Sequence, residues 1–124
     1  MSNGELYIME ILVKNGINFE REKTFSDLRG SLYRFDFYFP EKGICLEYDG
    51  EGHFSQIKKF YKNKSDFTRA QERDRRKNSY CLANKISLYR IPYWEIDNIK
   101  TLEDIFKEKF LVRSKWHNDN LKHH

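Results

Sequence analysis

Residues 34–53 constrain the fold of this chain more than any other segment, because they read as a β-hairpin with an acid in each strand. Apolar and aromatic residues lead up to a turn signal at positions 40–43 and continue after it. Asp36 interrupts the first run, and Glu47 interrupts the second. Strands disfavour acidic residues, and a buried carboxylate is costly unless a positive charge meets it. The two acids therefore indicate a site for a divalent metal and an anionic substrate.

The expected turn also predicts the register of the hairpin. With Glu41 and Lys42 at the tip, Asp36 lies opposite Glu47, and the two acids share one face of the sheet. The other positions divide into Tyr38 and Cys45 on that face and Phe37, Phe39, Ile44 and Leu46 on the opposite face. Opposed side chains have Cβ atoms about 5 Å apart, so the like charges repel unless Mg²⁺ lies between them. Alternatively, one acid is protonated or turned to solvent, or a β-bulge shifts the register.

Length and composition predict one domain with one hydrophobic core. The chain has 124 residues, and its aromatic content of 16% favours folding although 34% of the residues are charged. It has no apolar run of membrane-spanning length and no signal-peptide pattern, so we expect a cytoplasmic protein that does not bind membranes. Cys45 and Cys81 each lie in an apolar setting, which predicts buried free thiols rather than a zinc site or a disulfide framework.

The positive charge is concentrated in residues 58–77, which contain nine Lys or Arg against three acids. Such an excess beside a carboxylate site predicts binding to a phosphate backbone. The alternative is a solvated helix face. The candidates for phosphate contacts are Lys58, Lys59, Arg69, Arg73 and Arg76.

Hydrophobic periodicity and capping signals predict an α/β (α+β) domain over residues 1–113. The expected elements are helix 2–15, strands 17–25, 32–39 and 44–48, helix 65–83, strand 86–91, a turn or short helix at 93–98 and helix 101–112. The strands would form an antiparallel meander, followed by a crossover helix to a buried central strand, with helices packed on the sheet. Residues 114–124 are expected to be a frayed polar tail.

Four short motifs have a specific order and spacing. Glu5 precedes an aromatic, Phe19, by 14 residues; Asp36 lies between two aromatics; residues 49–53 form a glycine-containing segment that ends in His53; and residues 72–76 read Glu-Arg-Asp-Arg-Arg. Together they resemble the PD-(D/E)xK nucleases over about residues 5–92, most closely the very-short-patch-repair endonucleases and the EDxHD homing endonucleases. The four letters of EDxHD fall on Glu5, Asp36, His53 and Asp74.

The resemblance implies a restriction-endonuclease-like core and a Mg²⁺-dependent DNA endonuclease, in which Mn²⁺ could substitute. Asp36, Glu47 and the backbone carbonyl of Tyr48 would hold the metal, which would activate water and offset phosphate charge. A single small domain would nick duplex DNA, whereas a double-strand cut would need a homodimer or two successive nicks. Because the sequence shows no separate recognition domain, we expect either low target specificity or specificity supplied by a separate partner or a lost domain. The homing relatives suggest a phage or mobile-element origin, in a bacterial or phage-infected cell.

The chain departs from the family pattern in three ways. The usual motif has a lysine two residues after Glu47, where this chain has Asp49, so Lys77 on the following helix could supply the positive charge. The repair enzymes carry a structural zinc site, for which this chain lacks cysteines. They also place bulky aromatics before the histidine, where this chain has Glu51 and Gly52, so we do not expect mismatch recognition.

The residues after the second acid have two interpretations each. Asp49 would form an ion pair with Arg34, or else bind a second metal or hold His53. His53 would accept a proton from water or hold a metal-bound water, or else make a structural hydrogen bond.

Three further candidates are also ambiguous. Glu5 would cap the first helix together with Ser2, or else orient a metal-bound water. Asp74 would pair with Lys77 one helical turn away, or else join the site. Lys77 would stabilise the transition state.

Two other functions remain open. A non-catalytic nucleic-acid-binding module on a nuclease-like scaffold is favoured by the missing motif lysine and disfavoured by the retained acids. A ribonuclease with the same core would differ in substrate alone, and analogy between folds says little about substrate.

Overall fold

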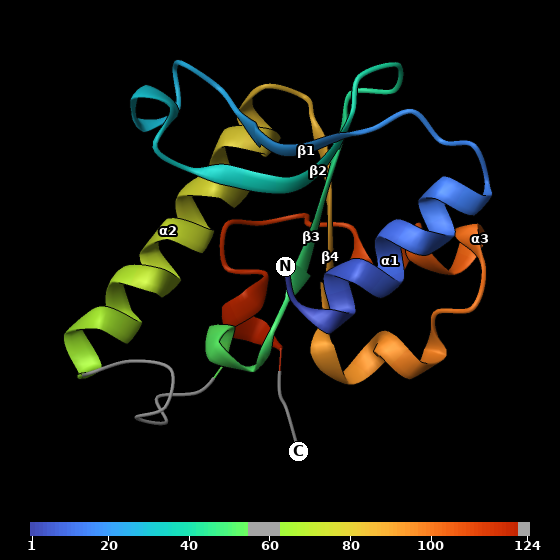
Figure 1. Ribbon diagram of the computed structural model, residues 1–124. Coiled ribbons are helices and arrows are strands. Elements are labelled where there is room, and N and C mark those ends of the chain that lie inside the picture. The colour runs from blue at the N-terminus through green and yellow to red at the C-terminus, as the bar shows by residue number, and fades with distance from the viewer. Residues whose placement is uncertain (55–62, 122–124) are drawn as a thin grey trace.

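The protein is described here by a computed structural model that covers residues 1–54 and 63–121 (Figure 1). It is a mixed α and β domain, as expected. One four-stranded sheet has the strand order β1-β2-β3-β4, in which the first two pairs are antiparallel and the last is parallel. The helices and strands are α1 (Asn3–Lys14), β1 (Glu20–Thr24), β2 (Arg34–Phe39), β3 (Ile44–Asp49), α2 (Lys64–Ala83), β4 (Ser87–Pro92) and α3 (Leu102–Ile105).

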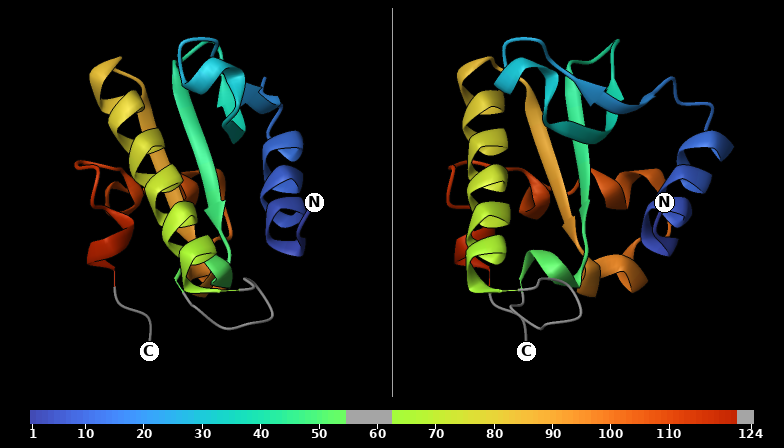
Figure 2. Two further views of the ribbon diagram at one scale, coloured as in Figure 1. Left: turned by 90° about the vertical axis from the view of Figure 1, so that its left-hand side faces the viewer. Right: turned by 60° about the vertical axis from the view of Figure 1, so that its left-hand side comes forward.

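Helices cover both faces of the sheet, with α2 on one face and α1 on the other (Figure 2). On the α1 face, Ile8 and Leu12 are fully buried in a cluster with Phe37 and Leu46. On the α2 face, the buried residues are Leu28, Phe35, Cys45, Cys81, Leu88 and Val112. Cys45 and Cys81 are free and buried, as the composition predicted.

The β2–β3 hairpin has the predicted register. Phe39 pairs with Ile44, Tyr38 with Cys45 and Phe37 with Leu46. The turn closes where the Gly43 N–H donates to the Phe39 carbonyl over 2.9 Å, and Gly43 adopts a φ of 62°, which favours glycine. This register brings Asp36 and Glu47 to the same level of the sheet.

Helix α1 begins at the expected place and lies close to β3. The Ser2 hydroxyl caps it by accepting a hydrogen bond from the Glu5 N–H over 3.1 Å. Gly4 is required by the close approach, since a Cβ at this position would lie 2.3 Å from Cζ of Tyr48. The contact places the first turn of α1 beside the end of β3.

The helix predicted over residues 101–112 is much shorter than expected. The capping box of Thr101 and Asp104 is present, but α3 ends at Ile105 and a 3₁₀ turn, η4 (Glu108–Phe110), follows. Ile105 and Phe110 are both buried. Five residues apart, they would lie on different sides of a continuous helix, so the break lets both face the core.

Two further expectations differ from the structure. Strand β4 lies at the edge of the sheet rather than at its centre; it is apolar because both of its faces are covered, and Leu111 and Val112 cover its outer edge. Residues 114–121 are ordered on α2 rather than frayed. There the Asn78 side chain donates to the Lys115 carbonyl over 3.0 Å, and Arg75 pairs with Asp119 at 2.9 Å. The rest of the expected tail, residues 122–124, lies outside the described residues.

Within the described parts of the chain, none of the helices has the length and apolar character that crossing a membrane requires.

The contact between Gly4 and Tyr48 predicts that Gly4→Ala destabilises the fold. Alanine is the better helix former, but the added methyl group must displace the Tyr48 ring, so we expect a loss of about 1–3 kcal/mol in the free energy of unfolding. Gly50→Ala is the matched control, because a Cβ there meets no atom within 4 Å. Urea denaturation of both variants measures the difference, and equal stabilities would contradict the prediction.

Candidate active site

The carboxylates of Asp36 and Glu47 each accept a hydrogen bond from a backbone N–H of the opposite strand. The Asp36 N–H donates to Oε2 of Glu47 over 2.7 Å, and the Tyr48 N–H donates to Oδ2 of Asp36 over 2.8 Å. These bonds continue the hairpin beyond the last backbone pair, Phe37 with Leu46. The two carboxylates are therefore fixed side by side, as the register predicted.

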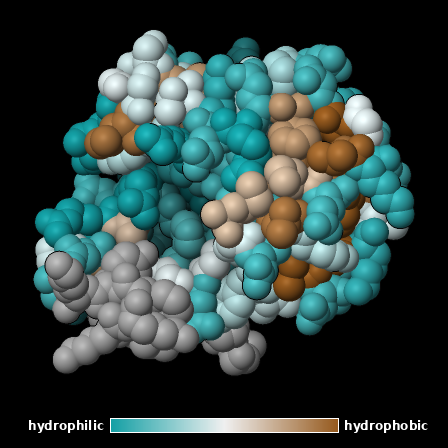
Figure 3. Space-filling view, viewed as in Figure 1, coloured by the Kyte–Doolittle hydropathy of each residue, from teal (hydrophilic) through white to brown (hydrophobic). Residues whose placement is uncertain are grey.

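The two acids line a groove of about 320 Å³ between α1, β2 and α2. Figure 3 shows a hollow with a hydrophilic surface in this region. Of the predicted site residues, the groove is lined by Glu5, Asp36, Glu47, Tyr48, His53, Arg73, Asp74 and Lys77. The fold thus brings residues from four segments of the chain to one surface.

Lys77 supplies a positive charge directly beside Glu47. Its Nζ is hydrogen-bonded to Oε1 of Glu47 and donates to the Arg34 carbonyl over 2.6 Å. The side chain is almost fully buried, with the ammonium group above the ring of Phe35. The expected pairing of Lys77 with Asp74 is not made: the ionic partners of Asp74 among the described residues are His53 and Arg90.

The pKa values of the two carboxylates are shifted in opposite directions because the charges around them differ. Burial, followed by the negative charges of Glu47 and Glu5, raises the pKa of Asp36 well above its ordinary value. Burial alone would also raise the pKa of Glu47, but the charges of Lys77 and Arg90 outweigh it and hold this pKa below its ordinary value. Asp36 is therefore the acid for which the nearby positive charge of Lys77 does not offset burial and the neighbouring acids.

This arrangement fits a hard divalent cation held by few protein ligands. No group of three or more His, Cys, Asp or Glu side chains that could hold a metal occurs within residues 1–54 and 63–121. Mg²⁺ does not need one, since it is often bound through one or two carboxylates and retained waters. Oδ1 of Asp36 accepts no hydrogen bond from the described residues, and a cation there would relieve the crowding of negative charge. The ligand role of the Tyr48 carbonyl stays a prediction.

Glu5 is tied to the site by Arg21 and does not complete a capping box. Ser2 caps the helix, while the Glu5 carboxylate accepts a hydrogen bond from Nη2 of Arg21 over 2.9 Å. Nε of the same arginine donates to the Asp36 carbonyl over 2.9 Å. Sequence reasoning missed Arg21, which is one of several charged residues in β1.

His53 forms a tight pair with Asp74. It lies in a 3₁₀ turn, η2 (Glu51–His53), directly after β3, and its Nδ1 is 2.7 Å from Oδ2 of Asp74 and 3.5 Å from Oδ1 of Asp49. Burial opposes the charged imidazole, but the Asp49 and Asp74 carboxylates outweigh it and raise the pKa of His53 above its ordinary value. The glycine-containing segment thus places His53 against α2.

Asp49 pairs with Arg90 and not with Arg34, so the predicted ion pair across the hairpin is wrong. Nη1 of Arg90 lies 2.9 Å from Oδ1 and 3.1 Å from Oδ2 of Asp49. Arg34 instead lies 3.9 Å from Glu22. The reason is the parallel pairing of β3 with β4, in which Arg90 is opposite Glu47 and reaches the next acid on the same face.

Arg90 is the residue that sequence reasoning missed most clearly. It is fully buried, its Nε donates to Oδ1 of Asn78 over 2.7 Å, and its Nη2 lies 3.7 Å from Oδ1 of Asp74. A buried charge needs partners, so an arginine inside an otherwise apolar strand was the available signal. The charge of Arg90, followed by contact with His53, outweighs burial and lowers the pKa of Asp74.

Asn118 completes the cluster from the C-terminal segment. Its Nδ2 donates to Oδ2 of Asp49 over 3.0 Å and lies 3.4 Å from Oδ2 of Asp74, the oxygen that also contacts His53. Nothing in the local sequence indicated this role, because the residue belongs to the stretch that was expected to fray.

The predicted phosphate-binding residues do not all reach the groove. Arg73 lines it, whereas Arg76 pairs with Glu72 at 2.7 Å and donates to the Tyr33 hydroxyl over 3.3 Å. Arg69 is exposed beside Asp66. Lys58 and Lys59 lie outside the described residues.

Comparison with known proteins adds little to this geometry. No family model matches the chain, and no solved structure matches it. A stretch of 58 residues is 38% identical to a protein of Invertebrate iridescent virus 6 called "Uncharacterized protein 307L". The stretch covers 47% of this chain and 29% of the viral protein, so the chain spans less than a third of that relative.

The buried cluster predicts a large effect of Arg90→Leu on stability. The variant would leave Asp49 and Asp74 buried without their main positive partner, and we expect a loss of about 3–5 kcal/mol near pH 7. The loss should shrink at acid pH, because protonation removes the uncompensated charges.

Chemical denaturation at several pH values tests this prediction. The control is Arg113→Leu, which removes an exposed pair with Glu108 and should cost less than about 1 kcal/mol. A loss for Arg90→Leu as small as that of the control would show that the cluster does not depend on the arginine.

Proposed function

We propose that this protein is a divalent-metal-dependent endonuclease with a PD-(D/E)xK-like core that nicks DNA. The observation that carries the proposal is the fixed pair of Asp36 and Glu47, which lies beside the buried ammonium group of Lys77 in a hydrophilic groove. Two acids and a lysine that converge from two strands and a helix are a set that phosphodiester hydrolysis can use.

The order of elements supports the same proposal. A helix, an antiparallel three-stranded meander, a crossover helix and a parallel strand follow one another, with the acids on β2 and β3. This is the order expected from the resemblance to the nuclease fold. Lys77 approaches Glu47 from α2, so the helix provides the charge that the motif lysine would provide from the strand.

The metal would be held by Asp36 and Glu47, with the Tyr48 carbonyl as a further candidate ligand. When bound, it would activate water and offset negative charge on the scissile phosphate. Lys77 adds a second positive charge to the groove, where it would stabilise the charge that develops on the phosphate. Arg73 lines the same groove and would contact a neighbouring phosphate.

His53 would act as the general base. Its Nδ1 contacts Asp74, so Nε2 is the nitrogen that would accept a proton from the attacking water. Asp74 would fix the tautomer and the orientation of the ring, as carboxylates do for catalytic histidines. Arg90 and Asn118 would act as positioning residues, because they hold Asp74 and Asp49 without lining the groove.

The metal site predicts that Asp36→Asn abolishes cleavage. The amide oxygen can still accept the Tyr48 N–H, so the hairpin should remain intact while the charge that attracts the cation is lost. We expect nicking of supercoiled plasmid with Mg²⁺ or Mn²⁺ to fall by about 10²–10³-fold, since a catalytic metal contributes several kcal/mol.

The matched control is Glu103→Gln, an exposed acid outside the groove. It should cut like the wild type, and EDTA should stop both. A wild-type protein that cuts neither DNA nor RNA with either metal would refute the enzyme, whereas cleavage of RNA alone would favour the ribonuclease.

The His53–Asp74 pair predicts the pH dependence of cleavage. The base must be deprotonated, so kcat/KM should rise with pH through the pKa of His53, which the two acids hold above its ordinary value. Asp74→Asn removes one of these charges and should move the rise to lower pH while lowering the maximum rate. A rise that stays at the same pH in this variant would exclude His53 as the titrating base.

A further inference from the structure

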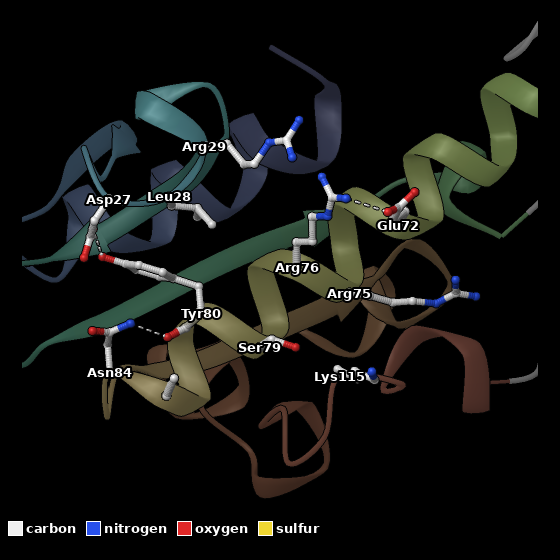
Figure 4. Close-up of a pocket in the computed structure, with 11 residues that line it drawn as sticks. Asp27, Leu28, Arg29, Glu72, Arg75, Arg76, Ser79, Tyr80, Asn84 and Lys115 are labelled. Carbon is white, nitrogen blue, oxygen red and sulfur yellow. Dashed lines mark hydrogen bonds and ion pairs between the residues drawn. The ribbon is translucent and has the colours of Figure 1, made fainter.

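A second and wider groove of about 570 Å³ runs along α2 (Figure 4). Its walls are the exposed side of α2, the loop that precedes β2, and the C-terminal segment. Side chains that can bind an anion come from all three walls: Arg29, Arg75, Arg76, Ser79 and Lys115. Two acids, Asp27 and Glu72, also line the groove, and Asp27 accepts a hydrogen bond from the Tyr80 hydroxyl over 2.6 Å. No part of the proposed catalytic site uses this groove.

Two of the four cations lack an acidic partner. Arg75 is paired with Asp119 at 2.9 Å, and Arg76 is paired with Glu72 at 2.7 Å. In contrast, Arg29 and Lys115 make no ion pair with any residue in the described ranges. Arg29 and Arg76 line the same groove from opposite walls, so an anion between them would be attracted by both, although Glu72 offsets part of the charge of Arg76.

The second groove is lined by residues that lie close in sequence to residues of the catalytic groove. Leu28 and Arg29 line the second groove, whereas Leu32 and Tyr33, a few residues later in the same loop, line the first. On α2, the consecutive residues Arg76 and Lys77 divide between the grooves in the same way. A polyanion that contacts Lys77 would therefore meet the wall of the second groove directly beyond Tyr33.

The loop that carries Arg29 has an unusual backbone. Arg29, Gly30 and Ser31 have φ values of 51°, 61° and 68°, so three successive residues are left-handed and two of them are not glycine. Such strain persists where the surrounding structure over-determines it, and it is often found at ligand-binding sites. Here it occurs in a loop that borders both grooves.

We propose that the second groove binds the phosphodiester backbone of the DNA strand on one side of the bond that is cut. The proposal rests on the nuclease function and adds the path of the substrate to it. Guanidinium groups suit phosphate because they form paired hydrogen bonds, and such backbone contacts fix register without reading sequence. Arg29 and Lys115 would make the main contacts, with Arg76 at the boundary.

The test is the salt dependence of binding by the double variant Arg29→Ala/Lys115→Ala. A fluorescein-labelled DNA duplex is titrated in EDTA by fluorescence anisotropy, so that no cleavage is required. Each phosphate contact contributes about 0.9 to the slope of log K against log salt concentration, so the slope should fall by about 1.8. The affinity should fall roughly ten- to hundredfold at about 0.1 M salt.

The control is Lys14→Ala/Lys42→Ala, which removes the same charge from exposed positions outside both grooves and should match the wild type. The proposal that the second groove binds DNA would be overturned by either of two results: a slope for Arg29→Ala/Lys115→Ala equal to that of the control, or a wild-type protein that does not bind DNA. If the slope of the groove variant is reduced but the wild-type protein does not cut DNA with Mg²⁺, DNA binding by the groove is supported and the proposed DNA nuclease activity is rejected. At saturating DNA, the groove variant should cut at the wild-type rate, with a raised KM.

Discussion

The charged cluster around Arg90 is the constraint on which the rest of the site depends. A fully buried guanidinium is tolerated only when several acceptors surround it, and here they come from β3 and α2. Asp49, Asn78 and Asp74 are thereby held at defined distances from β4. His53 then takes its position from two of these acids, so the end of β3 and the middle of α2 are joined by charge rather than by apolar packing.

A second electrostatic feature is the contrast between two neighbouring acids. Glu47 faces Lys77 and Arg90, which stabilise its charged form, whereas Asp36 faces other acids and receives mainly a backbone N–H. The folded chain alone therefore satisfies one carboxylate and leaves its neighbour in an unfavourable field. An amide at position 36 would remove this unfavourable charge and would keep an oxygen to accept the Tyr48 N–H.

Local signals in the sequence were sufficient for the hairpin, for both long helices and for the capping of α3. The register followed from the turn at residues 40–43 and from strand alternation, both of which involve residues near one another in the chain. The partner of Asp49 could not be predicted in this way, because it depends on the parallel pairing of β3 with β4 across the intervening helix α2. Asn118 was missed for a similar reason, since its contacts span 69 and 44 residues of sequence. The length of α3 was overestimated because periodicity does not show that Ile105 and Phe110 must both be buried.

The edges of the sheet have a consequence for the behaviour of the protein in concentrated solution. Strand β1 is short and strongly charged, with the sequence Glu-Arg-Glu-Lys-Thr, which discourages pairing with another chain. The other edge, β4, is apolar and is protected because Leu111 bridges to Tyr89 and the Val112 N–H donates to the Leu88 carbonyl over 2.8 Å. The segment after α3 thus covers the edge of β4 and prevents edge-to-edge association. A protein shortened before Leu111 would expose the unpaired backbone groups of β4, which could pair with a strand of another molecule.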